Sequence, residues 1–173
     1  TNGQDEPAFR LQVPHLRVDA GEVVALVGGN GSGKSTLARL LAGLLSPQLG
    51  AVRIRGAAAT PGELNRFTAY MFQDPDLQIF LPTVADELAY GLARQGRPQA
   101  VIDARVAEAI DRFSLPGPQV PAALMSYGAR KRLQAAVYYL LERPLVIIDE
   151  GDSGLGVVDF VRMVREFASP ETA

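Results

Sequence analysis

The chain contains no cysteine, and its single histidine is His15. The absence of cysteine excludes disulfide bonds, thiolate metal ligands and cysteine nucleophiles. One histidine argues against a histidine metal cluster and against a relay of several imidazoles. The chemistry of this chain must therefore use carboxylates, hydroxyls, amides, a few cations and the backbone.

Long apolar runs and an excess of positive charge are also missing. The longest apolar stretches, such as residues 23–27 and 145–148, are far shorter than the roughly 18 residues that a membrane span requires. The net charge of −2 gives no chain-wide basic field, so nucleic acid is not expected as a partner. The polar residues 1–7 lack the features of a signal peptide and are interpreted as a trimmed end.

The composition and the order of apolar patterns predict one α/β domain. Hydrophobic residues make up 47% of the 173 residues and charged residues 21%, as in globular proteins. Strands are predicted from short apolar runs at 23–27, 52–54, 68–72 and 145–148. Helices are predicted from apolar periodicity at 34–44, within 76–142, and at 157–168.

These patterns also predict how the domain is divided. We expect a parallel-sheet core formed by residues of about 8–75 and 143–173, with an inserted helical subdomain at about 76–142. The last predicted helix is not followed by the strand to which a crossover helix normally leads. The domain is therefore expected to be C-terminally truncated.

A glycine-rich segment follows the first predicted strand and has the spacing G-x-x-x-x-G-K-[ST]. With the threonine that follows, it consists of Gly28, Gly29, Asn30, Gly31, Ser32, Gly33, Lys34, Ser35 and Thr36. Small residues allow successive N–H groups to surround a phosphate, and the helix N-terminus adds a positive dipole end. Lys34 would reach the β- and γ-phosphates, and the Ser35 hydroxyl would bind Mg²⁺. The segment predicts a P-loop fold that binds a nucleoside triphosphate; an ordinary strand-to-helix turn is the alternative.

Two carboxylates, Asp149 and Glu150, follow the predicted strand 145–148. Open α/β sheets bind their ligands at the carboxyl ends of strands. In that position Asp149 would hold Mg²⁺, and Glu150 would polarise the attacking water or accept its proton. A solvated acidic turn is the alternative, and the glycine-rich segment favours the catalytic interpretation.

Two further segments resemble the ATP-binding cassette of ABC transporters, and the resemblance extends over residues 16–163. Phe72-Gln-Asp-Pro-Asp76 is similar to the Q-loop of that family. The resemblance implies that Gln73 contacts Mg²⁺ and the attacking water and links the core to the helical subdomain. It also implies a RecA-like sheet core and ATP hydrolysis with Lys34, Gln73 and Glu150 as catalytic residues.

The second segment, residues 124–132, resembles the signature sequence of ABC transporters and the helix that follows it. In that family the signature meets the γ-phosphate bound to a partner subunit. The resemblance therefore implies that Ser126 and Gly128 contact nucleotide. A plain helix cap is the alternative role of Ser126.

Residues 72–92 are similar to the energy-coupling factor subgroup, which powers the uptake of vitamins and transition-metal ions. The resemblance implies a second ATPase subunit and a transmembrane subunit as partners, and a peripheral location at the cytoplasmic face of the membrane. It also places the stretch after the Q-loop near the groove for a transmembrane coupling helix. Leu77, Ile79, Phe80 and Leu81 could instead be core residues of the helical subdomain.

The chain departs from the family pattern at several positions. Tyr127 stands where the signature has glycine, and Ala129 stands where it has glutamine. In the loop after Glu150, Gly156 replaces an aspartate that faces the partner subunit. No histidine follows Glu150, and Phe9 matches the position of the adenine-stacking aromatic poorly. Two alternatives to an importer ATPase therefore stay open: a degenerate regulatory half of an ABC heterodimer, and a soluble ABC-type ATPase not linked to transport.

Overall fold

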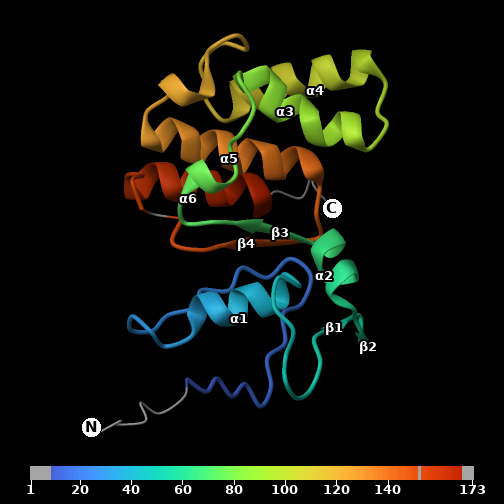
Figure 1. Cartoon of the computed structure of the whole chain (residues 1–173). Helices are drawn as coiled ribbons and strands as arrows, with labels where there is room; N and C mark the ends of the chain where they lie inside the picture. The colour runs from blue at the N-terminus through green and yellow to red at the C-terminus, as the bar shows by residue number, and fades with distance from the viewer. Residues whose placement is uncertain (1–8, 152, 169–173) are drawn as a thin grey trace, which may run out of the picture.

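The computed structural model describes residues 9–151 and 153–168 (Figure 1). Its helices are α1 (Lys34–Leu41), α2 (Pro61–Phe67), α3 (Val84–Arg94), α4 (Gln99–Arg112), α5 (Tyr127–Leu141) and α6 (Val157–Ala168). Its strands are β1 (Arg53–Ile54), β2 (Ala57–Ala58), β3 (Thr68–Met71) and β4 (Leu145–Ile148). Short 3₁₀ helices are η1 (Pro75–Leu77) and η2 (Ala122–Leu124). The predicted trimmed end at 1–7, Asp152 and residues 169–173 lie outside the described part.

The elements are stacked in layers around the pair β3 and β4. In Figure 1, α5 and α6 lie on one side of these strands, and α3 and α4 lie above α5. Helix α1 packs on the other side, through Ala38 and Ala42 against Tyr70 of β3. Helices therefore cover both faces of the strand pair, as the α/β prediction requires.

Strands β3 and β4 run parallel, with Thr68 opposite Leu145 and Met71 opposite Ile148. The Asp149 N–H continues the ladder by donating to the Met71 carbonyl at 3.0 Å. Parallel strands end at the same edge of a sheet, so the residues that follow β3 and β4 are brought together there. The strands predicted at 68–72 and 145–148 are confirmed. The short strand predicted at 52–54 is found as β1, which pairs antiparallel with β2.

The strand predicted at 23–27 is wrong for this structure. None of these residues belongs to a strand, and Val24 and Val27 are 54% and 90% exposed. A strand that is apolar on both faces requires a ladder partner and cover on both sides. Among the described residues, β3 and β4 pair with each other, and the segment 23–27 pairs with neither. An apolar run alone therefore did not determine a strand.

Helix α1 begins at Lys34 as predicted and ends at Leu41, earlier than the apolar pattern to Leu44 suggested. The chain turns at Gly43, which has φ +71°. A Cβ at this position would lie 2.3 Å from the Pro61 carbonyl oxygen. The close approach of the start of α2 therefore requires glycine there.

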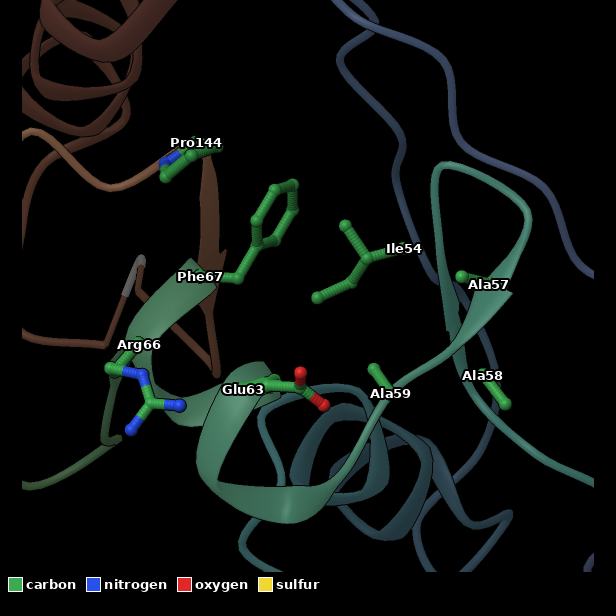
Figure 2. A pocket seen from close by; sticks show the side chains of 8 residues that line it. All are labelled: Ile54, Ala57, Ala58, Ala59, Glu63, Arg66, Phe67 and Pro144. Atoms are coloured by element: carbon green, nitrogen blue, oxygen red, sulfur yellow. The ribbon is translucent and has the colours of Figure 1, made fainter.

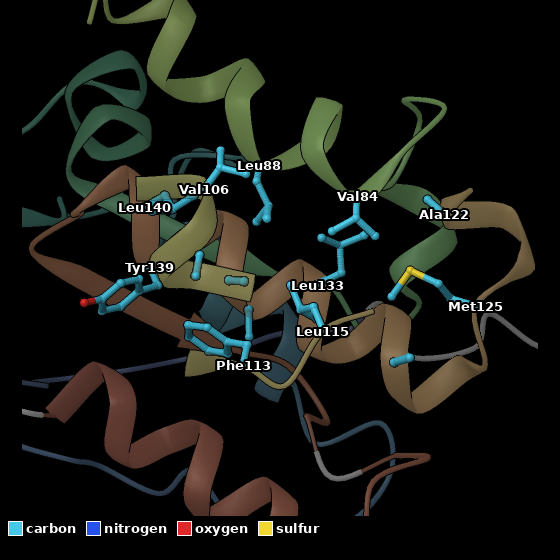
Figure 3. Close-up of a cluster of buried hydrophobic side chains, with 14 of the residues drawn as sticks. Val84, Leu88, Val106, Phe113, Leu115, Ala122, Met125, Leu133, Tyr139 and Leu140 are labelled. Carbon is cyan, nitrogen blue, oxygen red and sulfur yellow. The ribbon is translucent and has the colours of Figure 1, made fainter. Parts of the chain in front are cut away.

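The main hydrophobic core lies among α3, α4 and α5 (Figure 3). Helix α5 is central to it, and Leu133, Ala135 and Ala136 are fully buried. Val84 and Leu88 of α3 pack against α5 from one side, and Met163 of α6 belongs to the same cluster. All three helices α3, α4 and α5 fall within the range 76–142, and the division into core and subdomain stays a prediction.

Among the described residues, no helix is long and apolar enough to span a bilayer.

Candidate nucleotide-binding site

A hollow of about 350 Å³ lies at the N-terminus of α1. Its lining consists of Phe9, Asn30, Gly31, Ser32, Gly33, Lys34, Ser35, Thr36 and Glu150. The predicted glycine-rich segment and the predicted catalytic carboxylate are therefore brought together, although the chain between them is more than 100 residues long.

The backbone of the glycine-rich segment curls before the helix begins. Gly31 and Gly33 have φ of +75° and +94°, a region that favours glycine. Gly33 is the N-cap of α1, and no side chain caps this helix end. The N–H groups of the first turn are thus presented to the hollow together with the positive end of the helix dipole. This cradle fits a phosphate group.

The Lys34 side chain folds back and binds the start of the glycine-rich segment. Its Nζ atom donates to the Gly28 and Gly29 carbonyls at 2.8 and 2.9 Å. Lys34 also lines the hollow, so an oxyanion bound there can take the place of the two carbonyls as the acceptor of its ammonium group.

The Asp149 carboxylate is held from two sides. The Ser35 hydroxyl of α1 donates to its Oδ1 atom at 3.1 Å, and the Tyr70 hydroxyl of β3 donates to its Oδ2 atom at 2.6 Å. Burial, together with the bond to Asp149, raises the pKa of Tyr70 to about 12, so this hydroxyl stays protonated and donating. Tyr70 was not predicted as a site residue. Strand register could have indicated it, because Tyr70 lies opposite Ile147, two residues before Asp149.

Ser35 and Asp149 fit the donor set for Mg²⁺. This ion prefers oxygen ligands and is commonly held by one or two carboxylates together with substrate phosphates. The Ser35 and Asp149 oxygens already lie 3.1 Å apart, so both can face one ion. In the described part of the chain, no cluster of three or more His, Cys, Asp or Glu residues suited to a metal occurs.

Gln73 and Glu150 meet at the edge where β3 and β4 end. The Gln73 side-chain N–H donates to Glu150 Oε2 at 2.5 Å. Glu150 has φ +49°, which is uncommon for a residue other than glycine. This backbone turn directs the chain away from the sheet at the carboxylate, and strained backbone of this kind is often found at functional positions. The structure thus joins the predicted Gln73 and Glu150 as a hydrogen-bonded pair.

Ser126 and Gly128 lie apart from the hollow. The Ser126 hydroxyl accepts from the Ala129 N–H at 3.3 Å, so Ser126 caps α5. A Cβ at Gly128 would lie 3.1 Å from the Gly154 carbonyl oxygen, so Gly128 permits close packing against the loop after Glu150. Neither residue lines the hollow among the described residues. Their contact with nucleotide stays a prediction.

A second hollow, of about 400 Å³, lies between the β1–β2 hairpin and α2 (Figure 2). Figure 2 shows Ile54 and Phe67 on its walls and Glu63 at its lower side. Hydrogen bonds from Thr60 lower the pKa of Glu63, so this carboxylate is negative at neutral pH. Glu63 lies in the first turn of α2, where the Thr60 side chain already accepts from the Glu63 N–H, and Arg66 is the one cation among the described residues on the lining. These lining residues include no glycine-rich loop, so this hollow suits a triphosphate less well than the hollow at α1.

Comparisons with known proteins agree with the geometry. The sequence profile of the family described as "ABC transporter" matches residues 11–153. Over 84% of this chain and 55% of its own length, the energy-coupling factor transporter ATP-binding protein EcfA1 of Methanospirillum hungatei is 37% identical. The nickel import ATP-binding protein NikO of Rhodobacter capsulatus is also 37% identical, over 86% of this chain and 68% of its own.

A solved structure has the same fold. CbiO1 from Clostridium perfringens, described as part of the ABC transporter complex CbiONQ, matches with a TM-score of 0.77 and 28% identity over 88% of this chain and 63% of that chain. The fold is therefore that of a P-loop ABC ATPase, as predicted. Aligned with three other relatives, the chain spans 55 to 59% of their length. From the matched profile and these relatives we conclude that the chain belongs to the ABC transporter family, in its ATP-binding part.

Proposed function

We propose that this chain binds Mg-ATP at the hollow of α1 and serves as an ATP-hydrolysing subunit that energises a membrane importer. The observation that carries the proposal is the contact of 3.1 Å between Ser35 and Asp149. It joins the cradle for phosphate to the acidic end of β4. Phosphate oxygens and a divalent ion can then be bound at one place.

In this proposal the loop at 28–36 holds the β-phosphate through its N–H groups, and Lys34 pairs with the β- and γ-phosphates. Ser35 and Asp149, with Gln73 nearby, are the candidate ligands of Mg²⁺. The ion, when bound, neutralises charge that develops on the phosphates. Tyr70 holds the Asp149 carboxylate in place through its hydroxyl at 2.6 Å.

Glu150 is the proposed acceptor for the proton of the attacking water. A carboxylate is suited to this task when it is fixed within reach of the reacting atoms. The bond from Gln73 fixes one of its oxygens and leaves the second carboxylate oxygen to face water. Gln73 can therefore orient both the carboxylate and, through its amide oxygen, the metal or water.

For the transport system, we propose an energy-coupling factor type importer of a vitamin or a transition-metal ion. The similarity to EcfA1, NikO and CbiO1 supports this class. The chain would then lie peripherally at the cytoplasmic face of the membrane, with a second ATPase subunit and a transmembrane subunit as partners.

The surface next to Gln73 supports a transmembrane partner. Leu77 and Phe80 are 71% and 68% exposed, so the core interpretation does not fit these two side chains. Ile79 packs against the main core, and for this residue the core interpretation does fit. An exposed apolar pair beside the Q-loop is suited to an apolar face of a helix.

A regulatory half of a heterodimer is the second candidate function. Tyr127 favours it, because this residue at the start of α5 stands where the family has glycine, and its ring contacts the backbone at Gly154. In that case this chain binds ATP but contributes a weakened signature to its partner. Both candidates share the nucleotide site and differ in turnover.

We expect this chain alone to bind Mg-ATP in a 1:1 ratio and to hydrolyse it far more slowly than about 1 per second, the ordinary scale for enzymes. Tyr127 and Gly156 each remove part of the arrangement that encloses the γ-phosphate between two subunits in this family. Titration calorimetry measures binding, and phosphate release measures turnover. Absence of binding would refute the proposed site, and turnover near 1 per second would refute the dependence on a partner subunit.

A further inference from the structure

Tyr127, the residue that replaces a glycine of the signature, contacts both loops that carry the proposed catalytic pair. Its hydroxyl donates to the Gln73 carbonyl at 3.0 Å. Its ring packs on the backbone of Gly154, where an added Cβ would lie 2.3 Å from the ring atom Cδ1. One side chain at the start of α5 therefore bridges the loop after β3 and the loop after β4.

Each contact leads directly to the catalytic pair. Gln73 donates its side-chain N–H to Glu150, so the bond to its carbonyl fixes the backbone from which that amide extends. Gly154 directly follows Ser153, whose N–H donates to the Glu150 carbonyl at 3.1 Å. The ring on Gly154 therefore supports the turn that begins at Glu150.

Other contacts between α5 and the loop after β3 flank Gln73. Lys131 and Gln134 donate to the Phe72 carbonyl at 3.4 and 3.2 Å, and Arg130 forms an ion pair with Asp76. These bonds hold the loop on either side of Gln73. The Tyr127 hydroxyl binds between them, at the residue that bears the amide.

We propose that Tyr127 is a positioning residue that keeps the Gln73 amide and the Glu150 carboxylate at hydrogen-bonding distance from each other. This role rests on the proposed function, because it assigns the pair to ATP hydrolysis. A glycine at this position has no side chain to make either contact. Both contacts therefore require an aromatic residue with a hydroxyl group here.

The first test removes the hydroxyl alone. In Tyr127→Phe we expect amide hydrogen exchange over residues 73–76 to become about three- to tenfold faster, the range for loss of one partly exposed hydrogen bond. The affinity for Mg-ATP should stay within about twofold, while the slow turnover should fall by about tenfold. Tyr90→Phe, at an exposed tyrosine of α3, is the control and should change none of these quantities.

The second test displaces the ring from the other side. In Gly154→Ala, the added methyl group would collide with the Tyr127 ring. Amide hydrogen exchange over residues 73–76 should therefore also become faster, although Gly154 is far from that loop in the sequence. The control is Gly96→Ala. The φ of Gly96 is +73° and that of Gly154 is +75°, and a Cβ added at Gly96 would meet no atom within 4 Å. Gly96→Ala therefore reproduces the backbone strain without the collision.

Several results would overturn the proposal. Unchanged exchange over 73–76 in Tyr127→Phe would show that the hydroxyl does not hold the loop. An equal response to Gly154→Ala and Gly96→Ala would show that the ring contact has no part in it. Parallel losses of thermal stability, ATP affinity and turnover in Tyr127→Phe would show a folding role only. If the wild-type chain fails to bind ATP, the proposed function fails, and the exchange results still decide whether Tyr127 joins the two loops.

Discussion

Replacement of Lys34 by alanine should weaken the binding of Mg-ATP by about 100-fold. Hydrogen bonds to charged groups contribute about 1.5 to 3 kcal/mol each, and Lys34 is expected to pair with two phosphates, so a loss of about 3 kcal/mol is a conservative sum. The variant also loses the two bonds by which Lys34 Nζ holds the Gly28 and Gly29 carbonyls. Titration calorimetry at constant salt measures the change.

The control for this substitution is Arg94→Ala, which removes one positive charge from the exposed end of α3. It should leave the affinity unchanged within error, because an exposed charge far from the hollow is screened by salt. Equal affinities for the wild-type chain and a folded Lys34→Ala variant would show that the triphosphate does not bind in the hollow at the N-terminus of α1.

Replacement of Glu150 by glutamine should reduce turnover by at least about 100-fold in the assembled transporter and leave ATP bound. Glutamine keeps the shape of the side chain and can still accept the bond from Gln73, but it cannot take a proton from water. Phosphate release and nucleotide affinity, measured side by side, separate the chemical step from binding.

The matched control is Glu142→Gln. Glu142 also has a left-handed backbone, with φ +51° against +49° for Glu150, and it lies at the C-cap of α5 away from the hollow. Its substitution should leave turnover unchanged, although it loses the exposed ion pair with Arg105. Equal turnover in the wild-type protein and Glu150→Gln would show that Glu150 does not accept the proton. It would then be a residue of a solvated acidic turn, the alternative given by the sequence.

The predicted site segments that the structure brings together are those encoded within a few neighbouring residues. The glycine-rich segment and the acidic pair each combine a short spacing with a flanking helix or strand, and their meeting follows from the rule that ligands bind at the carboxyl ends of strands. Strand 145–148 and helix 157–168 were likewise predicted from local patterns and found at those bounds. The run 23–27 had an equally strong local pattern, but strand formation depends on a partner, which local patterns do not reveal.

The contacts that could not be predicted join residues far apart in the chain. Tyr70 binds Asp149 across 79 positions, and Tyr127 binds Gln73 across 54. Tyr127 was identified only as a bulky departure from glycine, and its partners depend on how α5 packs against both loops. Phe9 was judged a poor match for an adenine-stacking residue, yet it lines the hollow and its ring lies 3.2 Å from a Cβ built on Gly33. Such placements result from tertiary packing rather than from spacing in the sequence.

The most direct test of the account is a crystal structure of the chain with Mg²⁺ and a non-hydrolysable ATP analogue. We expect phosphate oxygens within about 2.7 to 3.2 Å of N–H groups in the loop at 28–36, with Lys34 Nζ moved from the Gly28 and Gly29 carbonyls to the phosphates. The metal should lie between the phosphates and the oxygens of Ser35 and Asp149. A triphosphate bound in the hollow between the β1–β2 hairpin and α2, with Lys34 still on its two carbonyls, would contradict the account.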